Sequence, residues 1–234
     1  MSGTLYGVGV GPGVPELLTL KAARILQHCP VIAYPTLEGA ASFARAIVAG
    51  YLTHKIEIPI SIPMGNATAT QNAYDAASGK ITEQLTAGRD VAVLCEGDPF
   101  FYGSFMYLYA RLFERHQVEI VPGVSSPMAA AAVLSMPLAA HNDIFTILPA
   151  PLDDAVLTSR LSNTDSAAII KLGRHFARIY ALLNQLGLAD RARYIERATL
   201  PAQKLLPLDR VQADHVPYFS LILVHRRTMA WRDG

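Results

Sequence analysis

The chain has 234 residues, of which 51% are hydrophobic and 17% charged, and its formal net charge is +1 at pH 7. This length suits one large domain or two compact ones, and the apolar fraction suffices for a packed core. The near-neutral charge excludes a global attraction to nucleic acid or to an anionic membrane. The two cysteines, Cys29 and Cys95, lie far apart outside any CxxC spacing, which argues against a disulfide framework and a zinc site.

The first residues, MSGTLYGVGVG, lack the basic and then apolar pattern of a signal peptide. The longest apolar stretch, from Met128 to Ala140, is too short to span a membrane and is interrupted by Ser135 and Pro137. We therefore expect a cytoplasmic protein without a membrane segment.

In the first half of the chain, short β-branched runs alternate with Ala- and Leu-rich stretches, which is typical of an α/β protein. The expected strands are Leu5–Val10, Val31–Tyr34, Lys55–Ile62, Val91–Cys95 and Val118–Val121. The expected helices are Pro15–Gln27, Ala40–Ala49, Asn72–Ala87 and Ser104–Arg115. The Pro122-Gly123 turn marks a domain junction, so we expect two α/β domains, 1–120 and 124–234.

The second half continues the same alternation. The expected helices are Ser126–Leu134 and Phe176–Leu186, and the expected strands are Phe145–Leu148, Ala167–Leu172, Arg193–Glu196 and Phe219–Val224. No internal repeat and no low-complexity segment is evident.

The glycine-rich loop GVGVGPG, residues 7–13, invites comparison with dinucleotide-binding loops. Its spacing does not fit GxGxxG, because Pro12 follows Gly11, and the next expected strand does not end in an acidic residue. These features argue against a nicotinamide or flavin enzyme. A plain turn in which glycines permit positive φ remains an alternative.

Three more segments follow expected strands, and they are rich in Gly, Pro, Ser or Thr. They are EGDPFFYGS (residues 96–104), VPGVSS (121–126) and ERATLPAQ (196–203). Ligands of open α/β sheets bind beyond the carboxyl ends of the strands. Together with the glycine-rich loop, these segments predict one shared ligand site.

In their order along the chain, the four segments resemble those of the tetrapyrrole methyltransferases of corrin and sirohaem synthesis. The EGDPFFYGSFMYLY stretch and the PYFSLILV ending resemble the branch that methylates precorrin-2 at C20, whereas sirohaem-forming members usually read GGDP. The resemblance implies two α/β domains with S-adenosyl-L-methionine in a cleft between them, a tetrapyrrole substrate and a homodimer. From the scattered Cys and His residues we expect no metal site, and from the near-neutral charge no nucleic-acid or membrane partner.

The resemblance also implies which residues bind the cofactor. They are Pro12, Glu96, Gly97, Asp98, Ser125, Ser126, Leu172, Ala198 and Thr199. The Glu96–Asp98 segment would contact the methionine portion, and the two serines would meet its carboxylate at a helix start. Leu172 would pack on the adenosine, and Ala198 with Thr199 would contact the adenine. The alternatives are a plain turn at Asp98 and a plain helix cap at the serines.

Tyr102 and Arg24 are weaker candidates for substrate binding, with core packing and a solvated helix face as their respective alternatives. No pattern identifies a catalytic base. Val14 departs from the family, which usually has Asp there; beside Pro15 this position would be the N-cap of a helix.

Several functions stay open on sequence alone. Within the family these are a cobalt-containing C20 substrate, C11 or C17 methylation, and ribose methylation of ribosomal RNA, against which the neutral charge argues. Outside it, a non-catalytic nucleotide-binding module could use the same loops.

Overall fold

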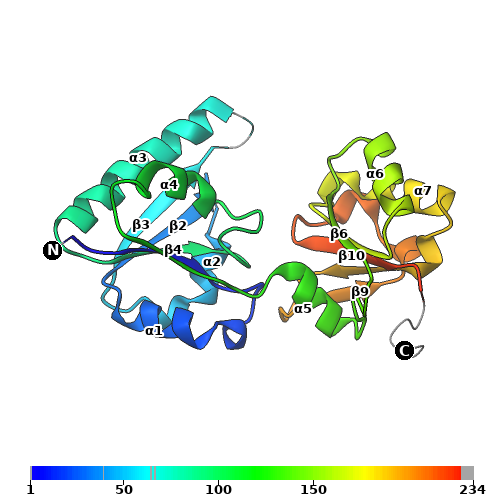
Figure 1. Ribbon diagram of the computed structural model, residues 1–234, viewed down its shortest axis with the longest axis horizontal. Helices are drawn as coiled ribbons and strands as arrows, with labels where there is room; N and C mark the ends of the chain where they lie inside the picture. Colours follow the sequence, from blue (N-terminus) through cyan, green and yellow to red (C-terminus); the bar gives the residue numbers. More distant parts are fainter. Residues whose placement is uncertain (1, 39, 64, 66, 228–234) are drawn as a thin grey trace. The chain divides into compact units, whose positions relative to one another are not determined.

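The computed structural model describes residues 2–38, 40–63, 65 and 67–227. The chain divides into two compact units, Met1–Ser125 (unit 1) and Ser126–Gly234 (unit 2). Each unit contains a five-stranded sheet with helices, so the expected α/β class is confirmed (Figure 1).

Unit 1 is built on a wholly parallel sheet. Its strands are β1 (Leu5–Gly9), β2 (Val31–Leu37), β3 (Ile56–Ile62), β4 (Val91–Cys95) and β5 (Val118–Val121). They lie in the order β3-β2-β4-β1-β5. Every residue of β4 is buried, as expected for a parallel strand covered on both faces. Because all five strands are parallel, their carboxyl ends meet at one edge of the sheet.

Helices cover both faces of the unit 1 sheet. They are α1 (Leu20–His28), α2 (Phe43–Ile47), α3 (Ala67–Thr86) and α4 (Phe105–Leu112), with short 3-10 turns at Pro15–Leu17 and Ala49–Tyr51. The buried side chains of α3 and α4, such as Ile81 and Phe105, pack on one face. Those of α1 and α2, such as Leu26 and Ile47, pack on the other. The result is a three-layer unit (Figure 1).

The helix expected from Pro15 begins later in the structure. Pro15–Leu17 is a 3-10 turn, Leu18 is extended, and α1 starts at Leu20. The Thr19 side chain accepts a hydrogen bond from the Ala22 N–H at 3.1 Å and thereby satisfies one of the free N–H groups of the first turn. The N-cap of α1 is therefore Thr19 rather than residue 14.

Unit 2 is built on a mixed sheet. Its strands are β6 (Phe145–Pro149), β7 (Ser166–Ile170), β8 (Ala192–Glu196), β9 (Lys204–Leu206) and β10 (Ser220–His225). They lie in the order β6-β7-β10-β8-β9; β6 and β7 are parallel, and β10 is antiparallel to both β7 and β8. The carboxyl ends of β6, β7 and β8 therefore lie at one edge.

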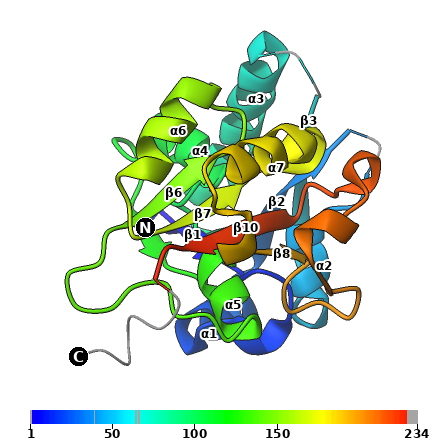
Figure 2. The ribbon, with the colours of Figure 1, turned by 90° about the vertical axis from the view of Figure 1, so that its right-hand side faces the viewer.

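Helices also cover both faces of the unit 2 sheet. They are α5 (Ser126–Val133), α6 (Asp154–Ser162) and α7 (Phe176–Gln185), with 3-10 turns at Gly173–His175, Ala189–Arg191, Leu208–Arg210 and Ala213–His215. Helices α6 and α7 lie on one face of the sheet and α5 lies on the other (Figure 2), and each face has its own buried cluster. Helix α6 and strand β9 are not among the elements expected from the sequence. Helix α6 has only a narrow apolar stripe, Leu157 and Leu161, and β9 has only three residues.

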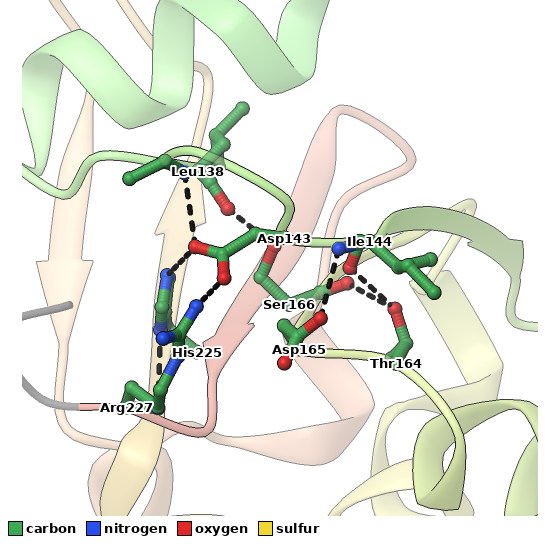
Figure 3. A network of polar contacts seen from close by, with 9 residues as sticks. Leu138, Asp143, Ile144, Thr164, Asp165, Ser166, His225 and Arg227 are labelled. Carbon is green, nitrogen blue, oxygen red and sulfur yellow. Dashed lines mark hydrogen bonds and ion pairs between the residues drawn. The ribbon is translucent and has the colours of Figure 1, made fainter. Parts of the chain in front are cut away.

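A polar network connects the loop before β6 to the end of β10 (Figure 3). The Asp143 carboxylate, whose side chain is 1% exposed, accepts a hydrogen bond from the Ala140 N–H at 2.9 Å and forms an ion pair with Arg227. The His225 Nε2 lies 4.0 Å from Asp143 Oδ2. A buried carboxylate is tolerated because such partners replace water.

Both cysteines are buried in unit 1, Cys29 at 3% and Cys95 at 1% exposure. Within the described ranges, no helix is both long and apolar enough to cross a membrane.

Candidate functional site

Two loops of unit 1 are joined by backbone hydrogen bonds at the carboxyl edge of the sheet. The Gly97 N–H, just after β4, donates to the Gly11 carbonyl at 2.8 Å, and the Gly11 N–H donates back at 3.3 Å. Both glycines have positive φ, 77° at Gly11 and 66° at Gly97, a region that L side chains rarely adopt. The glycine-rich loop and the EGDP segment therefore form one backbone structure.

The loop after β5 packs against the same structure. A Cβ on Gly9 would lie 2.6 Å from the Gly123 nitrogen and 2.7 Å from the Gly97 carbonyl oxygen, and a Cβ on Gly123 would overlap that oxygen. Backbone meets backbone here, so only glycine fits at these two positions. We call this arrangement of Gly9–Gly11, Gly97 and Gly123 the three-loop junction.

Asp98 connects two of these loops. Its Oδ1 accepts a hydrogen bond from the Phe100 N–H at 2.9 Å, and its Oδ2 accepts one from the Gly123 N–H at 3.0 Å. The first contact closes a local turn, which is the plain turn that the sequence offered as an alternative at Asp98. The second contact joins residues that are 25 positions apart in the sequence.

Glu96 lies at the end of β4 and is mostly buried. Burial raises the pKa of its carboxyl above the usual value of 4.5, while hydrogen bonds from its own N–H and from the Ala44 N–H oppose this shift. A carboxyl with a raised pKa at a strand end is typical of functional sites, although structural groups show it too.

Pro12 and Ser125 are half-buried at the same edge of unit 1, Pro12 directly after the glycine bridge and Ser125 after the third loop. Helix α5 begins at Ser126, which confirms the expected helix start. Ser126 is exposed and belongs to unit 2.

The two weaker candidates are exposed. Tyr102 is 46% exposed, has a positive φ of 56°, and forms an edge-to-face contact with Phe101 at 5.1 Å between ring centroids. Positive φ is unusual for a bulky residue. Arg24 lies on the exposed face of α1.

In unit 2, the predicted residues follow β7 and β8. Leu172 is fully buried in the cluster that contains Phe176, and Ala198 is 8% exposed. Both side chains are buried in the core, so only the main-chain groups of these two residues are available to a ligand. Thr199 has a φ of 74°, and its N–H donates to Gln203 Oε1 at 2.8 Å.

The Thr199 hydroxyl is buried and has no hydrogen-bond partner within the described part of the chain. An unsatisfied buried hydroxyl costs about 1–3 kcal/mol, so a ligand group that bonds to it would be favoured. Lys171 and Arg197 also have positive φ, 59° and 46°, and both directly follow a strand. Such strained backbone tends to gather at functional sites.

Glu196, the last residue of β8, is a buried acidic residue that was not among the predicted site residues. It is 5% exposed, the Tyr194 hydroxyl donates to its Oε1 at 2.8 Å, and Arg197 and Lys204 lie 3.8 and 3.7 Å from its Oε2. Burial and this neighbouring carboxylate raise the pKa of Tyr194. The sequence signal that could have identified Glu196 is an acidic residue at the end of an apolar strand.

A metal centre is not apparent in the described ranges, where no three His, Cys, Asp or Glu side chains form a group able to hold a metal ion.

The profile of the tetrapyrrole (corrin/porphyrin) methylases matches residues 4–212. The chain is 39% identical to the precorrin-2 C(20)-methyltransferase of a Sinorhizobium species, over 99% of this chain and 97% of that one. It is 34% identical to the cobalt-precorrin-2 C(20)-methyltransferase of Salmonella typhimurium, over 97% and 98%.

The cobalamin biosynthesis protein CobIJ of Mycobacterium tuberculosis is 41% identical over 95% of this chain, which spans only 46% of that longer relative. Among solved structures, a cobalt precorrin-4 methyltransferase aligns with a TM-score of 0.76 at 22% identity, over 95% of this chain and 94% of that one. The uroporphyrin-III C-methyltransferase of Thermus thermophilus, solved with S-adenosyl homocysteine, aligns at 0.70 and 24% identity, over 95% and 97%. These two structures share the fold. The profile match and the two relatives covered over nearly their whole length show that the chain belongs to the tetrapyrrole methylase family.

Proposed function

We propose that this chain is an S-adenosyl-L-methionine-dependent C-methyltransferase that methylates precorrin-2 at C20, giving precorrin-3A in cobalamin biosynthesis. The observation that carries this proposal is the 39% identity to a precorrin-2 C(20)-methyltransferase over nearly the whole of both chains. The match covers 99% of this chain, so it includes both units and all four loop segments.

A second candidate substrate is cobalt-precorrin-2. The Salmonella relative named for it is 34% identical over 97% of this chain, a modest step down from 39%. A precorrin-4 C(11)-methyltransferase from Pseudomonas aeruginosa is 29% identical and is covered over only 69% of its length, which makes C11 methylation a weaker candidate.

In unit 1, we infer that the three-loop junction holds the methionine portion of the cofactor. Pro12, Glu96, Gly97, Asp98 and Ser125 would take part, mainly through main-chain groups that the junction fixes in place. Bound there, the cofactor would supply an electrophilic methyl group, so the protein's task is to align it with the substrate carbon.

In unit 2, we infer that Ser126 and the segments after β7 and β8 complete the cofactor contacts. The N–H groups that begin α5 suit a carboxylate. The Thr199 hydroxyl, which lacks a partner among the described residues, would bond to the adenine, and Leu172 and Ala198 would offer main-chain groups. This buried hydroxyl without a hydrogen-bond partner is the observation in unit 2 that supports binding of a polar ligand.

Precorrin-2 is a macrocycle that carries acetate and propionate groups. Tyr102 and Arg24 are exposed, so an aromatic face and a cation are available to such a substrate. We further propose that the enzyme is a cytoplasmic homodimer without a nucleic-acid or membrane partner. The family resemblance and the net charge of +1 support that proposal.

The direct test is to incubate the purified chain with S-adenosyl-L-methionine labelled in its methyl group and with either precorrin-2 or cobalt-precorrin-2. We expect precorrin-2 to gain one labelled methyl at C20, seen by mass and NMR. Faster labelling of the cobalt form would favour the second substrate.

Methylation at C11 or C17 would contradict the C20 assignment. Binding of ATP or NAD in place of S-adenosylhomocysteine, with no methyl transfer, would indicate a nucleotide-binding module instead. The Gly79→Ala variant serves as a control for the methylation assay, because a Cβ at this position meets nothing within 4 Å and should leave the activity unchanged.

A further inference from the structure

The Asp98 carboxylate is already occupied by main-chain groups before any ligand arrives. One oxygen bonds to the Phe100 N–H at 2.9 Å and the other to the Gly123 N–H at 3.0 Å. Within the described ranges, it forms no ion pair with Lys, Arg or His. Two amide donors therefore hold this carboxylate, one in its own loop and one in the next.

The contact with Gly123 lies at the tightest point of the three-loop junction. Gly123 packs against Gly9 and Gly97 so closely that a side chain would overlap their backbone. Residues 124 and 125 follow directly, so the place of the Gly123 N–H determines where Ser125 lies. A charge-assisted bond at this point fixes the loop after β5 relative to the loop after β4.

We infer that Asp98 is a positioning residue: its carboxylate fixes the loop after β4 to the loop after β5 and sets cofactor affinity through the main chain of both loops. This inference rests on the proposed function, because it concerns how the cofactor site is held. It differs from a direct contact between the Asp98 side chain and the amino-acid portion of the cofactor.

The two roles predict different behaviour toward two ligands. S-adenosylhomocysteine carries an ammonium group on its amino-acid portion, whereas its deaminated analogue keeps the chain and the carboxylate but lacks that ammonium. A carboxylate that touches the cofactor's ammonium would matter for the first ligand only. A carboxylate that positions the loops would matter for both, because both ligands place the same chain and carboxylate in the loops.

The experiment is Asp98→Asn, titrated calorimetrically with each ligand. The amide keeps one oxygen for the Phe100 N–H, but its NH2 group cannot accept from the Gly123 N–H. Because a charge-assisted hydrogen bond is lost, we expect both dissociation constants to rise by a similar factor, about tenfold.

A matched control is Asp90→Asn. Asp90 Oδ1 also accepts from a main-chain N–H, that of Thr4 at 2.7 Å, but it precedes β4 at the opposite end of the strand. We expect this variant to bind both ligands as the unmodified protein does.

Amide hydrogen exchange gives a readout that needs no ligand. In Asp98→Asn, the Gly123 amide should exchange faster than in the unmodified protein, while in Asp90→Asn it should not. A loss of affinity for S-adenosylhomocysteine alone would overturn the inference in favour of direct contact, and unchanged affinity for both ligands would also overturn it. If the unmodified protein binds neither ligand, the proposed function fails and this inference fails with it, even when exchange at Gly123 is faster.

Discussion

Glu96 is a mostly buried carboxylic acid whose pKa burial raises above the usual 4.5. Folding therefore favours the protonated form of Glu96 relative to the unfolded chain. Its contribution to stability is complete below the unfolded pKa and is lost as pH rises through the folded pKa. The Glu96→Gln variant cannot ionise but keeps an oxygen for the Ala44 N–H. We expect it to raise the melting temperature more at about pH 8 than at about pH 5.

The matched control for that measurement is Glu83→Gln on the exposed face of α3. Its melting temperature should follow that of the unmodified protein at both pH values. An equal effect of Glu96→Gln at both pH values would show that ionisation of Glu96 does not limit stability.

Val14 precedes a 3-10 turn of three residues, and its side chain makes no capping hydrogen bond. An Asp there would cap only this short turn, so Val14→Asp should stabilise the protein by about 0.5 kcal/mol, the low end for an N-cap. Turnover should change by less than about threefold, since a tenfold change already needs about 1.4 kcal/mol of barrier. Thermal denaturation and steady-state rates test both. A large gain in rate without added stability would mean that the family's carboxylate belongs to the chemistry.

At the scale of single residues, the sequence predicts which residues follow the strand ends but not the partners of their side chains. The EGDP segment and the Ser125-Ser126 pair could be located because they follow apolar strands. The bond from the Gly123 N–H to Asp98 could not, because it joins residues 25 apart that only the parallel sheet brings together. Glu196 was missed because its burial depends on β9 and β10, which flank β8 in the sheet.

Among the elements, α1 depends on its N-cap. Thr19 accepts a hydrogen bond from the Ala22 N–H, and Thr19→Ala removes it, which should cost about 0.5–2 kcal/mol of unfolding free energy. Urea denaturation measures the loss. Thr86→Ala, at an exposed position that ends α3, removes the same atoms and should change stability much less. Equal losses in the two variants would contradict the capping role.

Two glycines give a paired test of the three-loop junction. Gly79 lies inside α3 with open space around it, so Gly79→Ala should stabilise the protein by roughly 0.5–1 kcal/mol. A methyl group on Gly123 would overlap the Gly97 carbonyl, so Gly123→Ala should lower the melting temperature and weaken binding of S-adenosylhomocysteine. Calorimetry measures both quantities. Normal affinity in a folded Gly123→Ala protein would show that the junction does not shape the cofactor site.

Elements with long apolar runs were predictable, and those set by their surroundings were not. The strand expected over Lys55–Ile62 contains Pro59, and β3 runs through this proline, because β3 is the edge strand of its sheet and a missing N–H is tolerated there. Pro15 was expected to open a helix that runs to Gln27, but Leu18 and Thr19 are extended and α1 begins at Leu20. The sequence gives no sign of that break, since all of PELLTLKA can form helix.

For the molecule as a whole, the α/β class follows from strands that are buried on both faces and so read as unbroken apolar runs, such as Val91–Cys95 and Ala167–Ile170. Each unit has its own buried clusters on both faces of its own sheet. The order of strands in each sheet does not follow from such runs. It depends on long-range packing, for example of Leu157 and Phe176 on one face of the unit 2 sheet.

Both cysteines are buried, so the rate at which they react with a reagent depends on how often unit 1 unfolds locally. Burial raises the pKa of the Cys29 thiol to about 11 and that of the Cys95 thiol to about 12, so little of the reactive thiolate exists in the native protein. A disulfide reagent should therefore label both only when unit 1 opens, and the labelling rate then measures how often that happens. Leu112→Ala, which leaves a cavity in the unit 1 core, should speed labelling, and a stoichiometric excess of S-adenosylhomocysteine should slow it. An ordinary absorbance assay can thus follow ligand binding without any substrate.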